Sequence, residues 1–271
     1  MQTTSKSVFH HNVAWADFST MATVHPTLAA IYNQFNLSQY DAEQSTAALL
    51  NQLASDFHCV SAPMFVEQQA FVDDRRYYEQ IIAEDGCVPT RADSWHDFFN
   101  GLIWLQFPQS KRVLNRMHIE DIIEFGVNPR TARRNRITHF DECGLILVCH
   151  TERAFAIIED LTEHNWISAL FDNSDSWHTD IEPLVFGHAN FEMLLNPYKQ
   201  LTAKWLMVEA PKKPSSLVID DVLQQELCNP SLFANRNTLK PLPLLGVPGW
   251  AEKQTHEFYV DTSVFRPLRR P

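Results

Sequence analysis

Glycine is scarce in this sequence, at seven of 271 residues. Rossmann and P-loop architectures depend on glycine-rich turns, and neither G-x-G-x-x-G nor G-x-x-x-x-G-K-[ST] occurs. The G-x-S-x-G motif of serine hydrolases is absent as well. These absences argue against the common nucleotide-binding folds and the nucleophile elbow, whereas fifteen prolines indicate many short elements separated by fixed turns.

Basic residues are outnumbered, because 22 lysines and arginines face 33 aspartates and glutamates, for a net charge of −11. A chain this acidic repels polyanions, so we expect no duplex nucleic acid as a partner. No apolar run has the length of a bilayer span or of a signal peptide, so we expect no membrane association.

Cysteine is also sparse, with five residues and no C-x-x-C pair. An odd number without that pair is typical of reduced thiols and argues against a disulfide framework or a zinc ribbon. Together with the missing signal peptide, it predicts a cytoplasmic protein. The sequence leaves the oligomeric state open.

Hydrophobic residues make up 45% of the chain and aromatic residues 11%, which is enough for a substantial core. Neither repeats nor low-complexity tracts interrupt it. We expect an α+β fold, a mostly helical single domain with a small β-sheet. Its parts would be a helical N-terminal region (1–90), a core α+β region with the candidate site (91–228) and a proline-rich C-terminal wrap (229–271).

Hydrophobic periodicity and helix-breaking residues predict the individual elements. Helices are expected over residues 26–35, 42–57, 65–84, 160–171, 187–195 and 219–227. Strands are expected over residues 145–149, 182–186 and 204–209. The polar residues just before the first of these strands are expected in a turn or at the edge of the sheet.

Residues 94–118, SWHDFFNGLIWLQFPQSKRVLNRMH, place polar side chains at helical spacing inside an apolar segment. In the first half, His96, Asp97 and Asn100 fall within an arc of about 100° on a helix whose other side is apolar. Pro108 ends this helix and is equally suited to begin a second one. We therefore predict a helical corner with a narrow polar stripe on its first arm.

The second arm carries a matching stripe. Lys111, Asn115 and His118 recur at i, i+4 and i+7, so they share one side of the helix. If the two stripes face each other, they bring two histidines, an aspartate, two asparagines and a lysine to one place. Asp141 and Glu142, just before the strand at 145–149, are candidates to join them.

The first hypothesis is an enzyme, a hydrolase, that acts on a small anionic substrate at this corner. His96 would be the base or a metal ligand, Asp97 its orienting or ligating partner, and His118 a second acid or ligand. Lys111 and Arg134 would stabilise charge. A mix of His, Asp and Glu is also suited to a divalent metal, although no strict ligand signature such as H-E-x-x-H is present.

Four arginines crowd into residues 130–136, and the guanidinium fork suits a phosphate or a carboxylate. Arg134 is our candidate among them, by position alone. Farther on, His188 and Glu192 stand one helical turn apart, a usable pair for metal or acid–base chemistry.

Each of these patterns has a structural alternative. Buried polar side chains usually find partners without doing chemistry, so His96 and Asn100 could simply cap or cross-link helices. The arginines could pair with neighbouring acids or lie on a solvated loop. The rival function is accordingly a non-catalytic protein that binds a partner or an anionic ligand through the same surface.

Several segments also carry a resemblance when taken in order: WHDFFN, FPQSK, FDECG, GVPGW and FRP. Over roughly residues 90 to 267 they resemble an uncharacterised proteobacterial family defined only as a domain of unknown function. The resemblance implies that these segments belong to one domain. It implies no activity, cofactor or site residue.

Overall fold

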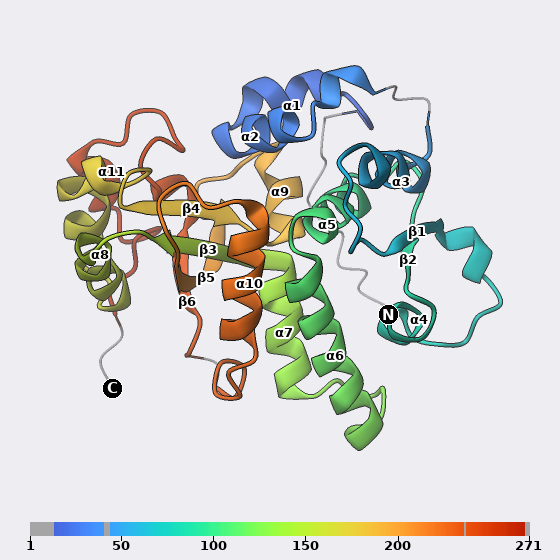
Figure 1. Ribbon diagram of the computed structural model, residues 1–271. Helices are drawn as coiled ribbons and strands as arrows, with labels where there is room; N and C mark the ends of the chain where they lie inside the picture. Colours follow the sequence, from blue (N-terminus) through green and yellow to red (C-terminus); the bar gives the residue numbers. More distant parts are fainter. Residues whose placement is uncertain (1–13, 41–43, 236, 269–271) are drawn as a thin grey trace, which may run out of the picture.

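The computed structural model describes residues 14–40, 44–235 and 237–268, and this part of the chain is a mostly helical α+β protein (Figure 1). The helices are α1 Phe18–Val24, α2 Pro26–Gln34, α3 Thr46–Asp56, α4 Tyr78–Asp85, α5 Trp95–Gln106, α6 Pro108–Phe125, α7 Ala132–Cys143, α8 Glu152–Thr162, α9 His188–Leu194, α10 Ser216–Leu227 and α11 His256–Tyr259. The strands are β1 Met64–Glu67, β2 Cys87–Thr90, β3 Gly144–Cys149, β4 Ile181–Val185, β5 Thr202–Glu209 and β6 Lys240–Pro243. None of the described helices is long and apolar enough to cross a membrane.

The larger sheet is organised around β3, whose residues are all buried. Its strand order is β4-β3-β5-β6, with β3 parallel to β5 and antiparallel to β4, and with β6 antiparallel to β5. A strand buried on both faces consists of apolar residues without alternation, which is how the sequence reads at 145–149. The three strands expected from the sequence are therefore confirmed, and β6 is added to them.

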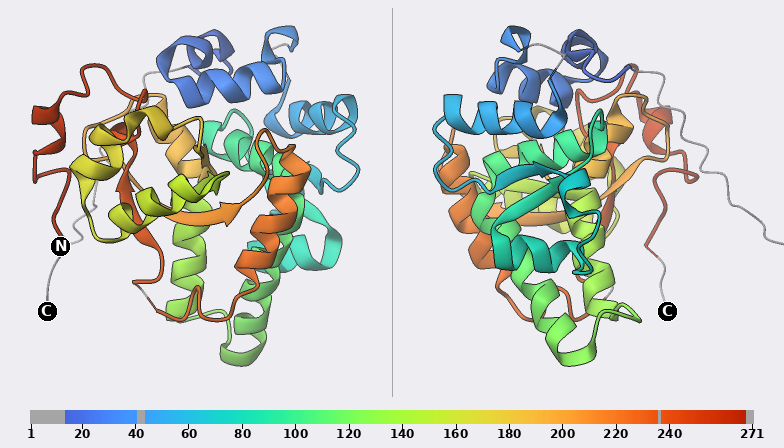
Figure 2. Two further views of the ribbon diagram at one scale, coloured as in Figure 1. Left: turned by 60° about the vertical axis from the view of Figure 1, so that its left-hand side comes forward. Right: turned by 90° about the vertical axis from the view of Figure 1, so that its right-hand side faces the viewer.

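The predicted helical corner is confirmed. Ser94 caps α5 by accepting a hydrogen bond from the Asp97 amide, and Pro108 is the first residue of α6. Helix α6 continues to Gly126, whose positive φ of 81° suits glycine. In Figure 2, α6 and α7 run side by side as a hairpin that projects from the sheet, and the right-hand view brings α4 and the β1–β2 pair to the front.

The helix expected over residues 65–84 is wrong, because this segment begins as strand β1, continues as a short 3₁₀ helix at Gln68–Phe71 and becomes α-helical only at Tyr78. The strand pairs in parallel with β2, more than twenty residues farther on, and the amide of Asn51 bonds both backbone groups of Phe65. Hydrogen bonds from Asn51 on α3 thus take the place of those that a second neighbouring strand would make. Neither interaction is local in sequence, so periodicity alone misses it.

The turn expected before β3 is also wrong, since Asp141 and Glu142 lie on α7. The side chain of Thr131 caps this helix by accepting from the Arg134 amide. The helix expected over 160–171 is likewise wrong in its bounds, because α8 ends at Thr162 and a π-helical turn, Ile167–Asp172, follows.

Two further expectations differ in detail. The helix predicted from residue 42 begins at Thr46, and residue 42 itself lies outside the described residues, as do 1–13 of the N-terminal region. The described part of the C-terminal wrap is not extended throughout, since it contains β6 and α11.

Candidate active site

A cavity of about 380 Å³ lies between α4, α5, α6 and α7, and we call it the central cavity. The polar stripes of both corner helices face it. Its wall contains most of the side chains singled out from the sequence: His96, Asp97, Asn100, Lys111, Asn115, His118, Asp141 and Glu142. Arg134 is fully buried and does not line the cavity. The fold thus gathers these residues, while their roles stay predictions.

Lys111 is held tightly in this wall, with 4% of its side chain exposed. Its ammonium donates to the carboxylate of Asp141 and, at 2.9 Å, to the amide oxygen of Asn100. It also lies 5.5 Å from the centre of the Trp104 ring. Burial has the largest single effect and raises the pKa of Asp141, but Lys111 and the neighbouring histidines together outweigh it, so the net pKa lies below the ordinary value. Ionised Asp141 and Lys111 therefore form a neutral pair.

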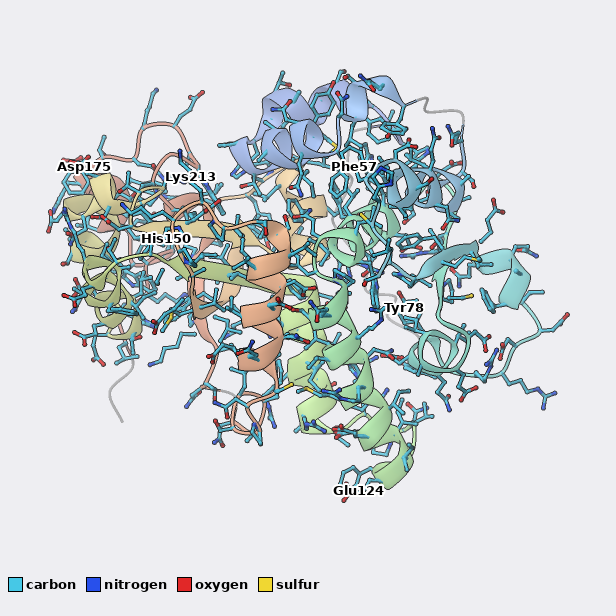
Figure 3. The ribbon with its side chains drawn as sticks, in the orientation of Figure 1. Phe57, Tyr78, Glu124, His150, Asp175 and Lys213 are labelled. Atoms are coloured by element: carbon cyan, nitrogen blue, oxygen red, sulfur yellow. The ribbon has the colours of Figure 1, made fainter. Side chains whose placement is uncertain are left out.

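Asn100 connects this pair to α4. Its amide nitrogen donates to the hydroxyl of Tyr78 at 3.0 Å. Figure 3 labels Tyr78 in the space between α4 and the α5–α6 corner. Burial raises the pKa of the Tyr78 phenol, so this hydroxyl is neutral at pH 7.

His96 takes its partner from another helix. Its Nδ1 lies 2.9 Å from Glu192 Oε2 on α9, and its ring meets the edge of the His188 ring with centroids 4.6 Å apart. The neighbouring Asp97 turns away and accepts hydrogen bonds from the backbone and guanidinium of Arg91, each at 2.6 Å. The carboxylate that orients His96 is thus Glu192 and not the adjacent Asp97 expected from the sequence.

Glu142 lies in the same part of the wall as His96. Burial and, secondarily, the charge of Asp141 raise the pKa of Glu142. The neighbouring His96, Arg130 and Lys111 only partly oppose this rise. The pKa values of these two adjacent carboxyls on α7 are therefore shifted in opposite directions, down for Asp141 and up for Glu142.

A second cluster joins α4, α6 and α7. Arg134 Nε donates to His118 Nδ1 at 3.5 Å, and burial lowers the pKa of His118 to about 4. His118 is therefore neutral at pH 7 and carries its hydrogen on Nε2. Glu79 Oε1 lies 3.8 Å from His118 Nδ1, while Glu79 Oε2 is buried without a hydrogen-bond partner among the described residues. Burial raises the pKa of Glu79.

Asn115 and Arg134 have structural contacts in this cluster. The Asn115 amide donates to the backbone oxygen of Glu79 at 3.1 Å, which fixes α4 against α6. Arg134 Nη1 donates to the Val127 carbonyl at 2.8 Å, and the guanidinium lies 5.4 Å from the centre of the Tyr77 ring. The arginine chosen from the sequence thus supports the wall from behind.

Arg130 is the member of the arginine cluster that lines the cavity. Its Nη2 donates to the hydroxyl of Tyr77 at 2.8 Å and its Nη1 to the hydroxyl of Thr138 at 3.2 Å. Both partners are neutral and both also line the cavity. Within the described ranges, Arg130 forms no ion pair, in contrast to Lys111 and Arg91.

Sequence reasoning did not single out Glu79, which lies in the segment where it expected a helix over residues 65–84. It also expected Glu192 to serve its own helix with His188, whereas Glu192 reaches across to His96. The capping pattern beginning at Thr131 was a usable signal for α7, and it would have placed Arg130 at the start of a helix that ends beside β3.

The described residues provide no ligand set for the metal ion considered from the sequence. Across residues 14–40, 44–235 and 237–268, no group of three or more His, Cys, Asp or Glu side chains has an arrangement that could hold a metal ion. Of the cavity's acids, Asp141 pairs with Lys111, Asp97 pairs with Arg91, and Glu79 lies beside His118.

Comparison with known proteins gives one match. A family model described as a protein of unknown function, DUF3025, matches residues 64–269, a span that contains every residue lining the central cavity. Neither a curated protein nor a solved structure matches the chain significantly.

Proposed function

The chain belongs to the DUF3025 family of proteins of unknown function, and for this member we propose an enzyme, a hydrolase, that acts on a small anionic substrate in the central cavity. The observation that carries the proposal is the His96–Glu192 pair, at 2.9 Å, on the same cavity wall as a glutamate with a raised pKa. Base and acid candidates standing together in a polar cavity are typical of acid–base catalysis.

In this mechanism His96 is the general base. With Nδ1 donating to Glu192, the lone pair of His96 lies on Nε2, which takes a proton from water as its oxygen attacks the substrate. Glu142, protonated, gives its proton to the leaving group. His96 then returns its proton to solvent and Glu142 takes one up, which restores the starting state.

The remaining cavity residues hold the site in shape. Asp141 and Asn100 fix the Lys111 ammonium, which has three N–H donors and so retains one for a substrate oxygen. Neutral His118 is suited to donate from Nε2, and its low pKa argues against a role as the acid at neutral pH. Asp97 and Asn115 support the wall through Arg91 and Glu79.

The second candidate is non-catalytic binding of an anionic ligand. It is favoured by the extent of pairing within the wall, since Lys111 and Asp97 are both committed to partners of opposite charge. A polar cavity whose charged groups are largely paired is equally what a binding protein needs.

A panel of phosphate esters, carboxylate esters and amides, each offered to the full-length chain, separates the two. We expect one class to be hydrolysed and His96→Asn to lower kcat by about 10²-fold to 10⁴-fold, the usual share of a general base. The matched control is His58→Asn, an exposed histidine at φ 51°, a conformation that asparagine tolerates. Ligand binding without turnover of any class, or equal kcat in both variants, would reject the enzyme.

A further inference from the structure

We infer that Arg130, Tyr77 and Thr138 form the subsite for the anionic group of the substrate, and that this group is a phosphate. The inference rests on the proposed function, because it names where the anion of that substrate lies. All three residues line the central cavity, and Arg130 contacts the other two directly.

Arg130 and its two hydroxyl partners retain hydrogen-bond donors that have no acceptor among the described residues. Arginine has five N–H groups, of which one on each terminal nitrogen serves the Tyr77 and Thr138 hydroxyls. Each hydroxyl accepts from Arg130 and therefore keeps its own hydrogen to donate. Among the described residues, no other hydrogen bond of these three side chains accompanies these two. The cluster is thus rich in donors and short of acceptors.

The distribution of charge in the cavity also favours an anion at Arg130. The other cavity cations are paired, Lys111 with Asp141 and Arg91 with Asp97. Among the described residues, the hydrogen-bond partners of Arg130 are two hydroxyls and it forms no ion pair. The guanidinium of Arg134 adds a second positive charge behind the Tyr77 ring, 5.4 Å from its centre. An oxyanion at Arg130 would therefore complete a positive site instead of breaking an existing ion pair.

Two acids face Arg130, and both are disposed to accept a proton. Burial raises the pKa of Glu79 and of Glu142, even though Arg130 opposes the rise in each case. A protonated carboxyl donates to an anion, where a carboxylate would repel it.

The number of donors favours phosphate over carboxylate. The guanidinium fork takes two oxygens of an oxyanion side by side, which uses both oxygens of a carboxylate. The flanking hydroxyls of Tyr77 and Thr138 would then have no oxygen left to bond. A phosphate offers a third oxygen to them.

Isothermal titration calorimetry with inorganic phosphate and the full-length chain tests the subsite. A parallel titration with malonate tests carboxylate binding. We expect phosphate to bind more tightly than malonate. Arg130→Gln should weaken phosphate binding by about 10-fold to 100-fold, and Tyr77→Phe or Thr138→Val by up to about 10-fold, the usual effects of charged and neutral hydrogen bonds. Arg153→Gln, the matched control, removes an exposed arginine that does not line the cavity and should change the affinity less than about threefold.

The subsite is refuted if wild type fails to bind phosphate, if Arg130→Gln binds it as well as wild type, or if malonate binds more tightly. Should Arg130→Gln unfold, Arg130→Lys keeps the charge but loses the fork and should still weaken phosphate binding. The His96→Asn variant makes the two proposals separable. Phosphate binding to wild type and to His96→Asn, with no turnover by wild type, supports the subsite and rejects the hydrolase, whereas turnover by wild type that His96→Asn abolishes, without phosphate binding, does the reverse.

Discussion

Lys111 and Asp141 form an ion pair across the wall of the central cavity, with the lysine side chain 4% exposed and the aspartate 24% exposed. The pair joins α6 to α7 at the place where β3 begins. It therefore ties the polar stripe of the helical corner to the sheet, and its integrity is a condition for the geometry of the whole site.

Asp141→Asn should destabilise the fold by about 3 kcal/mol, because it leaves the lysine charge buried without its counter-ion. We place the loss at the low end of the range for buried pairs because a quarter of the aspartate is exposed to the cavity. The double variant Lys111→Met/Asp141→Asn leaves no buried charge and should recover much of the loss. Urea unfolding measures all three free energies, and a single variant within about 0.5 kcal/mol of wild type would contradict the pairing.

Glu79→Gln should stabilise the protein at pH 8. Burial raises the folded-state pKa of Glu79 above 4.5, so the fold binds its proton more tightly than the unfolded chain does. Stability then falls as pH rises above 4.5 and levels off above the folded-state pKa. Glutamine does not titrate, so we expect a gain of about 1 kcal/mol, or ~3 °C in Tm, at pH 8.

The same gain should vanish near pH 4, where Glu79 is protonated in both states. The control is Glu124→Gln, an exposed glutamate that Figure 3 labels at the tip of the α6–α7 hairpin. Its Tm should follow that of wild type at both pH values. A Glu79→Gln variant less stable than wild type at pH 8 would show that the ionised carboxylate contributes to the fold.

The helical corner was predictable because its determinants are local. Proline fixes the break between α5 and α6, and spacing along each helix decides which side chains share a face. Because the chain turns between α5 and α6, polar stripes on the inner faces of these two helices border the same cavity. This is why most of the predicted site residues line one hollow although the sequence offered no catalytic motif.

The partners were not predictable, because they come from distant segments. Glu192 reaches His96 from α9, and Glu79 reaches His118 from α4, which is positioned by the pairing of β1 with β2. Arg134 was chosen over Arg130 by position alone. Which of two arginines on one stretch faces a cavity depends on the rotation of α7 against α6, and no local pattern encodes that rotation.

Gly187 controls the approach of α9 to the site. It precedes His188, and a Cβ at this position would lie 2.4 Å from the backbone oxygen of Glu142 and 2.5 Å from the backbone nitrogen of Gly144. These are main-chain atoms at the junction of α7 and β3, so they cannot rotate aside. Gly187→Ala must therefore push α9 outward, and with it the Glu192 carboxylate that holds His96.

We expect Gly187→Ala to cost about 3 kcal/mol, the upper range for overpacking, and to weaken turnover along with stability. Gly101→Ala is the comparison, since the atoms nearest to its new methyl would be side-chain atoms of Leu50, the first at 2.2 Å, and alanine favours the helix by about 1 kcal/mol. Leu50 can change rotamer, so this variant should lose less free energy of unfolding. Equal losses in the two variants would mean that the α7–β3 junction yields to the methyl group, and that the spacing of α9 is not set by Gly187.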